Sequence, residues 1–255
     1  MDSAGTTLPL ENVVLEGDRI LEAAEASGLT VRLLGGVAVA RHVHRPLPDE
    51  LGRPYGDIDI ITSGREGRKV RDILVALEYQ PNRPFNSLHG ERRLQFLDVR
   101  NERHLDVLID VFEMCHRLDD LPLAAHPRTL SPADLLLTKL QVVQVTEKDL
   151  IDACTLLLQH DVLRGSGDVV DLGRLSDVTR RDWGWYTTTT DNLARLADFA
   201  DSRLASPGDR QDVADKVRLI AAELVSTPKT LKWKARARVG RRVPWYVLPD
   251  EPNVM

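Results

Sequence analysis

The sequence lacks several features that would place a protein in a common class at once. No apolar run approaches the roughly 20 residues that a membrane-spanning helix needs. No basic segment followed by an apolar core stands near residue 1, so we expect no secretory signal. The two cysteines, Cys115 and Cys154, lie far apart and form no Cys-x-x-Cys motif. We therefore expect reduced thiols and a cytoplasmic protein.

Familiar catalytic signatures are also missing. There is no Gly-x-Ser-x-Gly, no Gly-Lys-Ser/Thr after a glycine-rich turn, and the seven histidines show no metal-ligand spacing. These absences argue against a serine hydrolase of the elbow type, a P-loop enzyme and a histidine-based zinc site.

The formal net charge of −5 argues against a surface that binds nucleic acid everywhere. The charge is uneven, however, because seven Lys or Arg and no acid lie between Lys229 and Arg242. With Trp233 and Trp245 nearby, this segment either binds RNA or is a solvated end whose aromatics pack on the preceding helices. The sequence slightly favours packing, because Pro244 and Trp245 resemble packing elements.

Helical and strand patterns alternate over the first 115 residues. Apolar residues recur at helical spacing in three segments and continuously or alternately in four others. The predicted order is a helix at 11–27, a strand at 29–34, a helix at 37–44, a loop at 45–56, a strand at 57–62, a helix at 64–79, and a hairpin of strands at 92–99 and 104–112. This order predicts a mixed α/β sheet.

The rest of the chain reads as helical. Ser131 is the expected N-cap of a helix that has Pro132 at its first position, and a second helix is expected after Thr146. Further helices are expected over 168–226. We therefore predict two domains, at 1–120 and 121–255, with the basic segment at the end of the second.

Carboxylates stand inside apolar strands of the first domain. In "YGDIDIIT", residues 55–62, strand alternation sends Asp57 and Asp59 to one face. The later strand "HLDVLIDVF" brings in Asp106 and Asp110. Neighbouring carboxylates repel each other, so water or a cation must offset their charge.

A glycine pair ends the first strand and begins a helix. Gly35 and Gly36 would expose backbone N–H groups there, which suits phosphate oxygens, and glycine permits a close approach. Carboxylates on a neighbouring strand can hold Mg²⁺, and a third carboxylate permits a second ion. Together these features suit nucleotidyl transfer from a nucleoside triphosphate.

"LLGGVAVARH", "YGDIDIIT" and "HLDVLID" together resemble the nucleotidyltransferase fold of the DNA polymerase beta type. The resemblance covers roughly residues 29 to 112 and implies an α/β (α+β) fold, with flanking helices around a mixed sheet and a helical C-terminal domain. "SPADLLLTKLQ" followed by "EKDLIDACTLL" resembles the region after the core in AbiEii-type and MenT-type nucleotidyltransferase toxins.

The resemblance implies a role for each matching residue. Gly35 and Gly36 would cradle the phosphates, while Asp57, Asp59 and Asp106 would bind metal and act in catalysis. For the third acid, Asp106 is preferred over Asp110, and Asp98 stays a weaker alternative. In the helical part, Lys139 would approach the nucleotide, supported by Asp149 and Asp152. Without the resemblance, Lys139 is a surface charge and the two aspartates favour a helix start.

The implied function is Mg²⁺-dependent transfer of a nucleoside monophosphate from a nucleoside triphosphate to an acceptor hydroxyl, with two ions. Resemblance to the toxin branch implies a transfer RNA end as acceptor and an antitoxin protein as partner. Two alternatives stay open on the residues. One is a nucleotidyltransferase that modifies a small antibiotic, and the other is a nucleotide-binding module without turnover.

Overall fold

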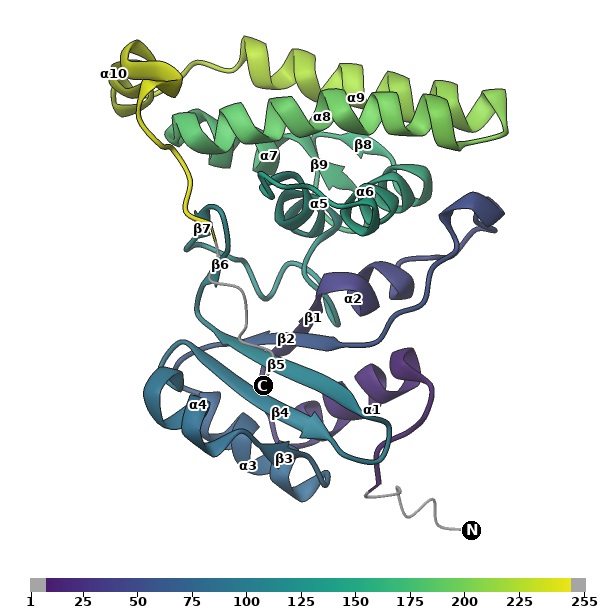
Figure 1. The fold of residues 1–255 in the computed structure, drawn as a ribbon, viewed down its shortest axis with the longest axis vertical. Helices are drawn as coiled ribbons and strands as arrows, with labels where there is room; N and C mark the ends of the chain where they lie inside the picture. The colour runs from purple at the N-terminus through teal and green to yellow at the C-terminus, as the bar shows by residue number, and fades with distance from the viewer. Residues whose placement is uncertain (1–7, 249–255) are drawn as a thin grey trace. The chain divides into compact units, whose positions relative to one another are not determined.

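The computed structural model describes residues 8–248 and has the predicted mixed α/β class (Figure 1). Contacts group the described chain into two compact units that interleave along the sequence. The first unit comprises residues 8–41, 54–112 and 119–130, and the second comprises 42–53, 113–118 and 131–248. Among the helices of the described residues, none combines the length and apolar character that crossing a bilayer requires.

The first unit is built on a five-stranded sheet in the order β1-β2-β5-β4-β3. Of the four adjacent pairs in this order, β2 and β5 run parallel and the other three pairs are antiparallel. Its elements are α1 (Val13–Ala26), β1 (Val31–Leu34), α2 (Gly35–Arg41), β2 (Ile58–Thr62), α3 (Gly67–Ala76), β3 (Gln80–Pro81), α4 (Arg83–His89), β4 (Arg93–Asp98) and β5 (Arg103–Ile109).

Strand alternation gives this sheet one buried face and one partly open face. On β5, Leu105, Val107 and Ile109 are buried, whereas the residues between them are half-buried. Helix α3 covers the buried face, since Gly67 lies close to Ile109. Asp59 and Asp106 have the opposite orientation, because they alternate with the buried positions of their strands. The open face therefore carries the acidic residues.

A buried carboxylate joins helix α1 to the end of α3. Glu16 has no exposed surface, and its carboxylate accepts a hydrogen bond from the Tyr79 hydroxyl at 2.6 Å. It also accepts from Arg19 Nε at 2.8 Å and from the Leu10 N–H at 2.9 Å. Burial, together with the hydrogen bond to Glu16, raises the pKa of Tyr79, so this hydroxyl remains the donor. The network fixes α1 on the sheet.

The second unit is mainly helical, as predicted. Ser131 caps α5 and accepts from the Asp134 N–H, and Thr146 caps α6 in a capping box with Asp149. The remaining elements are η1 (Asp49–Leu51), β6 (Phe112–Glu113, which begins in the first unit), β7 (Arg117–Leu118), α5 (Pro132–Leu140), α6 (Glu147–Gln159), β8 (Val162–Leu163), β9 (Val170–Asp171), α7 (Leu172–Arg181), α8 (Trp183–Arg203), α9 (Pro207–Ser226), α10 (Leu231–Val239) and η2 (Gly240–Arg242).

The proline-rich segment 42–53 belongs to the second unit because helix α6 binds it. Gln159 Oε1 accepts from the N–H groups of His44 at 3.0 Å and Arg45 at 2.8 Å. Its amide nitrogen donates to the Arg45 carbonyl at 3.1 Å. Two turns earlier on α6, Asp152 binds Arg53. The loop predicted at 45–56 is therefore an ordered segment.

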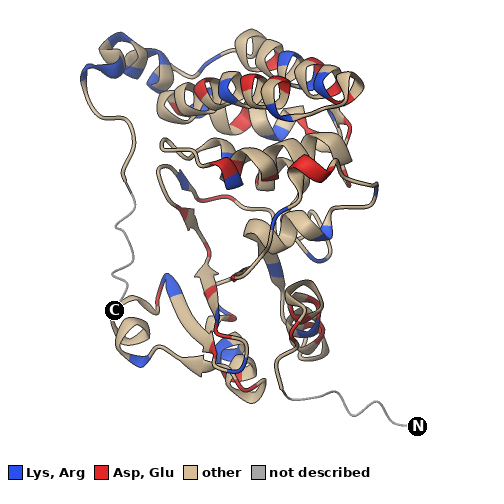
Figure 2. Cartoon of the chain, turned by 45° about the vertical axis from the view of Figure 1, so that its right-hand side comes forward, with Lys and Arg blue, Asp and Glu red and all other residues tan. Residues whose placement is uncertain are grey.

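Aromatic packing at the end of the chain agrees with the favoured prediction. The Trp233 ring meets Tyr186 edge-on at 5.3 Å, and the Trp245 ring meets Trp183 at 5.8 Å. Trp245 Nε1 donates to the Thr188 hydroxyl at 3.1 Å. Lys and Arg nevertheless recur along α10, whose ribbon is blue at these positions in Figure 2.

Most predicted elements are present, with differences at helix ends. Helix α2 begins at Gly35 and ends at Arg41, earlier than the predicted 37–44. Helix α4 was not predicted, because none of its seven residues is buried and it has no apolar stripe. It forms because Asn82 caps it and Pro84 occupies its first turn.

The Glu16 network predicts an asymmetric stability effect. Glu16→Ala leaves Tyr79 and Arg19 without their acceptor in a buried site, so the free energy of unfolding is expected to fall by about 3 kcal/mol. Glu22→Ala on the same helix removes an exposed carboxylate and is expected to cost under about 1 kcal/mol. Urea denaturation followed by circular dichroism measures both, and equal losses would contradict the role given to Glu16.

Candidate active site

The corner between β1 and α2 requires glycine. Gly35 has φ of +68°, a conformation that residues with a side chain rarely adopt. A methyl group on Gly35 would lie 3.1 Å from Asp59 Cγ and would overlap Asp59 Oδ2. The corner therefore brings the backbone of Gly35 directly against the Asp59 carboxylate, with no side chain between them.

Asp59 and Asp106 are neighbours across the parallel pair of strands. The register of β2 and β5 pairs Asp59 with Asp106, while the register of β1 and β2 pairs Leu34 with Asp59. The glycine corner and these two carboxylates therefore lie side by side on the open face. Such close acids repel each other unless a positive charge lies near them.

Arg93 supplies a positive charge within the chain. Its Nε donates to Asp106 Oδ1 at 2.9 Å and its Nη2 donates to Oδ2 at 2.7 Å. The two side chains are 44% and 18% exposed, so the pair is open to solvent on the arginine side. The hydrogen bonds to Asp106 raise the pKa of Arg93 against the opposing effect of burial, and the charges of Asp106 and Asp59 add to the rise.

Asp57 stands before the strand and is exposed. It makes no hydrogen bond or ion pair with the residues that the structure describes. In this part of the chain, Asp57, Asp59 and Asp106 do not present one oxygen each within 4.8 Å of the others. The first two acids of the predicted set thus differ in their surroundings, since Asp59 is packed against Gly35 and Asp57 is free to rotate.

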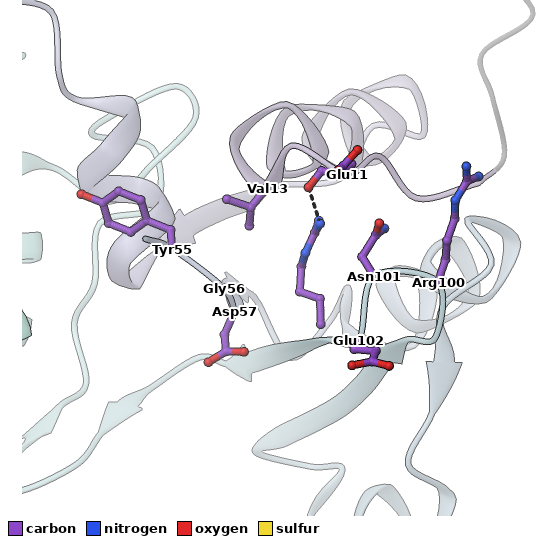
Figure 3. A pocket seen from close by; sticks show the side chains of 9 residues that line it. Glu11, Val13, Tyr55, Gly56, Asp57, Arg100, Asn101 and Glu102 are labelled. Carbon is purple, nitrogen blue, oxygen red and sulfur yellow. Dashed lines mark hydrogen bonds between the residues drawn. The ribbon is translucent and has the colours of Figure 1, made fainter. Parts of the chain in front are cut away.

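A pocket of about 500 Å³ lies beside Asp57 in the first unit (Figure 3). The start of α1, residues 55–57 and the turn at 100–103 line it. Arg103 Nη2 crosses to the carbonyl oxygens of Leu10 and Glu11, at 3.0 and 2.8 Å. Asp57 is one of the lining residues, and in Figure 3 its carboxylate points away from Glu11 and Asn101.

The two alternative acids have structural partners elsewhere. Asp110 follows β5 with φ of +62°, and its carboxylate accepts from the Gly64 N–H at 2.8 Å. Asp98 is fully buried and binds the turn at 100–101, with Arg103 Nη1 at 3.9 Å. Neither is the register partner of Asp59, a position that Asp106 occupies.

The predicted helper residues form an ion cluster in the second unit. Lys139 Nζ lies 2.8 Å from Asp152 Oδ2 and 3.5 Å from Asp149 Oδ1. Asp152 has no exposed surface and also takes a two-pronged ion pair from Arg53, at 2.8 and 2.7 Å. Asp149 completes the cap of α6. Asp152 is thus fully engaged, and 13% of the Lys139 side chain remains exposed.

Sequence reasoning missed two arginines that bind predicted site residues: Arg93 binds Asp106, and Arg53 binds Asp152. Arg93 stands two residues before Gln95, the cross-strand partner of Asp106, so a register model of the hairpin would have placed it diagonally beside that acid. Arg53 carries no comparable signal, because only the path of the 42–53 segment brings it to α6.

The glycine corner predicts separable effects on stability and chemistry. Gly35→Ala and Gly28→Ala both impose a side chain at positive φ, so each is expected to lower the free energy of unfolding by about 1–2 kcal/mol. Only Gly35→Ala displaces Asp59, because nothing lies within 4 Å of a Cβ at Gly28.

A displacement near 1 Å in a catalytic group lowers rates by about 100-fold. We therefore expect nucleotide turnover to fall by about 100-fold in Gly35→Ala and to stay unchanged in Gly28→Ala. Steady-state assays measure the turnover, and urea denaturation measures the stability of both variants. Equal activities of the two variants would contradict a role of the Gly35 corner in catalysis.

Comparison with known proteins adds an independent finding. The model of a family described as "Uncharacterised nucleotidyltransferase" matches residues 11–199, a span that contains the sheet, the glycine corner and helices α5 to α7. No curated protein matches this sequence. Because the family match covers well over half of the chain, this protein belongs to that nucleotidyltransferase family and is a nucleotidyl-transferring enzyme.

Proposed function

We propose that the enzyme transfers a nucleoside monophosphate from a nucleoside triphosphate to an acceptor hydroxyl, with Mg²⁺ held by Asp57, Asp59 and Asp106. The observation that carries the proposal is the register of Asp59 with Asp106 beside the Gly35 corner. In this reaction the acceptor oxygen bonds to the α-phosphorus, and the bond to the bridging oxygen breaks to release pyrophosphate.

The residues at this site fit a divalent ion. Three carboxylates form a hard oxygen donor set, which Mg²⁺ prefers. Arg93 already places a cation against Asp106, which supports a site that needs positive charge. Asp57 is free to turn toward Asp59, because no other described residue holds its carboxylate. When bound, Mg²⁺ would neutralise phosphate charge and lower the pKa of the acceptor hydroxyl.

The chain's own groups supply orientation and proton transfer. The Gly35 backbone faces the Asp59 carboxylate without an intervening side chain, and the N–H groups of Gly35 and Gly36 at the start of α2 would bind polyphosphate oxygens. Asp106 Oδ1 or Oδ2 would accept the proton of the acceptor hydroxyl once the Arg93 pair opens. Arg93 would then be free to donate to a phosphate oxygen.

The acceptor that we propose is a transfer RNA end, on the basis of the resemblance to the toxin branch, and an antitoxin protein would accompany that role. Expression in bacteria tests it, since growth arrest that depends on Asp59 is expected. Resistance to an aminoglycoside or lincosamide without growth arrest would instead favour a small-molecule acceptor.

Carboxylate substitutions test the chemistry directly. Asp59→Asn and Asp106→Asn are expected to lower transfer of labelled nucleotide to total RNA by at least about 100-fold, because each removes a charge that acts in the transition state. Asp110→Asn, which removes the same charge from the end of the same strand, is the matched control and should retain activity. The proposal fails if Asp59→Asn matches wild type on RNA and on small-molecule acceptors alike.

Lys139 is proposed to contact the triphosphate, as the resemblance implies. Lys139→Gln is expected to weaken nucleotide binding about tenfold, since one charge-assisted contact is lost. Arg53→Gln removes the other cation from Asp152 and is the control. Calorimetric titration with a non-hydrolysable triphosphate measures nucleotide affinity and so distinguishes a contact with the triphosphate from a role in the ion cluster alone. If both variants lose stability and neither loses nucleotide affinity, Lys139 serves only the ion cluster.

A further inference from the structure

Helix α10 and the turn after it carry positive charge that the proposed chemistry does not use. Seven Lys or Arg occur from Lys229 to Arg242 without an acid, in a chain whose net charge is −5. The structure divides these cations into two groups. One group is engaged in the packing of the second unit, and the other is exposed.

Three of the seven bind described residues of α8, α9 or the basic segment itself. Arg236 donates to the carbonyl oxygens of Gly240 and Val243, at 2.7 and 2.8 Å. Arg241 forms an ion pair with Asp191 at 2.8 Å and lies 5.0 Å from the Trp245 ring centroid. Lys229 donates to the carbonyls of Leu224 and Thr227. These contacts give the segment a fixed conformation.

The other four cations are Lys232, Lys234, Arg238 and Arg242. Each is exposed and makes no hydrogen bond or ion pair with the described residues. The backbone that carries these four cations is ordered. Little conformational entropy of the chain is therefore lost when a polyanion binds to them. Figure 2 shows blue segments around α10 and its following turn.

The pattern of α10 disfavours a membrane surface as the partner. In "LKWKARARV" charged and uncharged residues alternate, and on a helix this period distributes charge around the axis and leaves no apolar stripe. A helix that lies in a membrane interface needs such a stripe. Trp233 is also engaged with Tyr186, so it is not available for insertion.

The packed aromatics also restrict how a nucleic acid would bind. Proteins that grip unpaired bases use exposed aromatic rings as stacking platforms. Trp233 and Trp245 pack on α8 residues instead. The surface therefore offers charge to phosphates without a means of reading bases.

We propose that Lys232, Lys234, Arg238 and Arg242 form a docking surface for the phosphate backbone of structured RNA. The choice of RNA over DNA rests on the proposed function, in which an RNA hydroxyl is the acceptor. Binding itself requires neither nucleotide nor metal, and it is independent of base sequence.

The test measures RNA binding in EDTA, without any triphosphate. A fluorescent RNA hairpin is titrated with the full chain and with a variant carrying Gln at all four positions, and anisotropy is read across a salt series. Each phosphate contact contributes roughly 0.7 to 0.9 to the slope of log affinity against log salt, so the variant should lose roughly 3 units of slope. Affinity should fall at least about tenfold at 0.1 M salt.

The matched control substitutes Gln at four exposed cations of the first unit, Arg65, Arg68, Lys69 and Arg83. It removes the same total charge and should leave affinity and slope within about twofold of wild type. Tryptophan fluorescence of each variant verifies that Trp233 and Trp245 remain packed.

Three results would overturn the inference: an unchanged slope in the α10 variant, an equal loss in the control, or equally tight binding of an acidic peptide at α10. Preferential binding of a DNA hairpin of the same sequence would overturn the assignment to RNA. Asp59→Asn separates this inference from the proposed chemistry, because it should bind RNA normally while transferring no nucleotide.

Discussion

Repulsion between two carboxylates on adjacent parallel strands is the constraint on which the rest of the first unit depends. The register that pairs Asp59 with Asp106 cannot bring these acids together without a nearby positive charge. In the structure that charge comes from Arg93, whose guanidinium binds both oxygens of Asp106. In the function that we propose, a divalent ion would take the same electrostatic role with a higher charge.

The glycine corner follows from the same constraint. Asp59 occupies the space that a side chain at position 35 would need, and the positive φ of Gly35 turns the chain from β1 into α2 at that point. One glycine thus serves the backbone geometry and the position of an acid together. On the opposite face, the Glu16 network and the buried residues of β5 hold the sheet that sets this register.

Charge in the second unit has two distinct uses. Around Asp152, buried opposite charges bind the 42–53 segment to α6, and the geometry is specific because Arg53 approaches with both nitrogens. Around α10, exposed like charges have no counterpart among the residues that the structure describes, and their arrangement suits a long polyanion better than a single small ligand. Acids and bases of similar appearance in the sequence therefore have different roles, which burial and partners distinguish.

Local patterns were sufficient for most of the element order, without α4, and for the caps at Ser131 and Thr146. Strand alternation and side-chain capping act over a few residues, so the sequence determines them directly. Local patterns did not predict which residue each acid contacts. Asp106, Asp110 and Asp98 look alike in the sequence. Strand register places Asp106 beside Asp59. Turn geometry places Asp110 at the Gly64 N–H and Asp98 at a buried turn.

The sequence by itself therefore determined most of the strands and helices and supplied the candidate acids. Tertiary structure decided which of those acids meet, that Arg93 and Arg53 neutralise them, and which cations of the basic segment stay exposed. The physical reason is that hydrogen bonds and ion pairs between residues distant in the chain depend on register and burial, which no local pattern encodes.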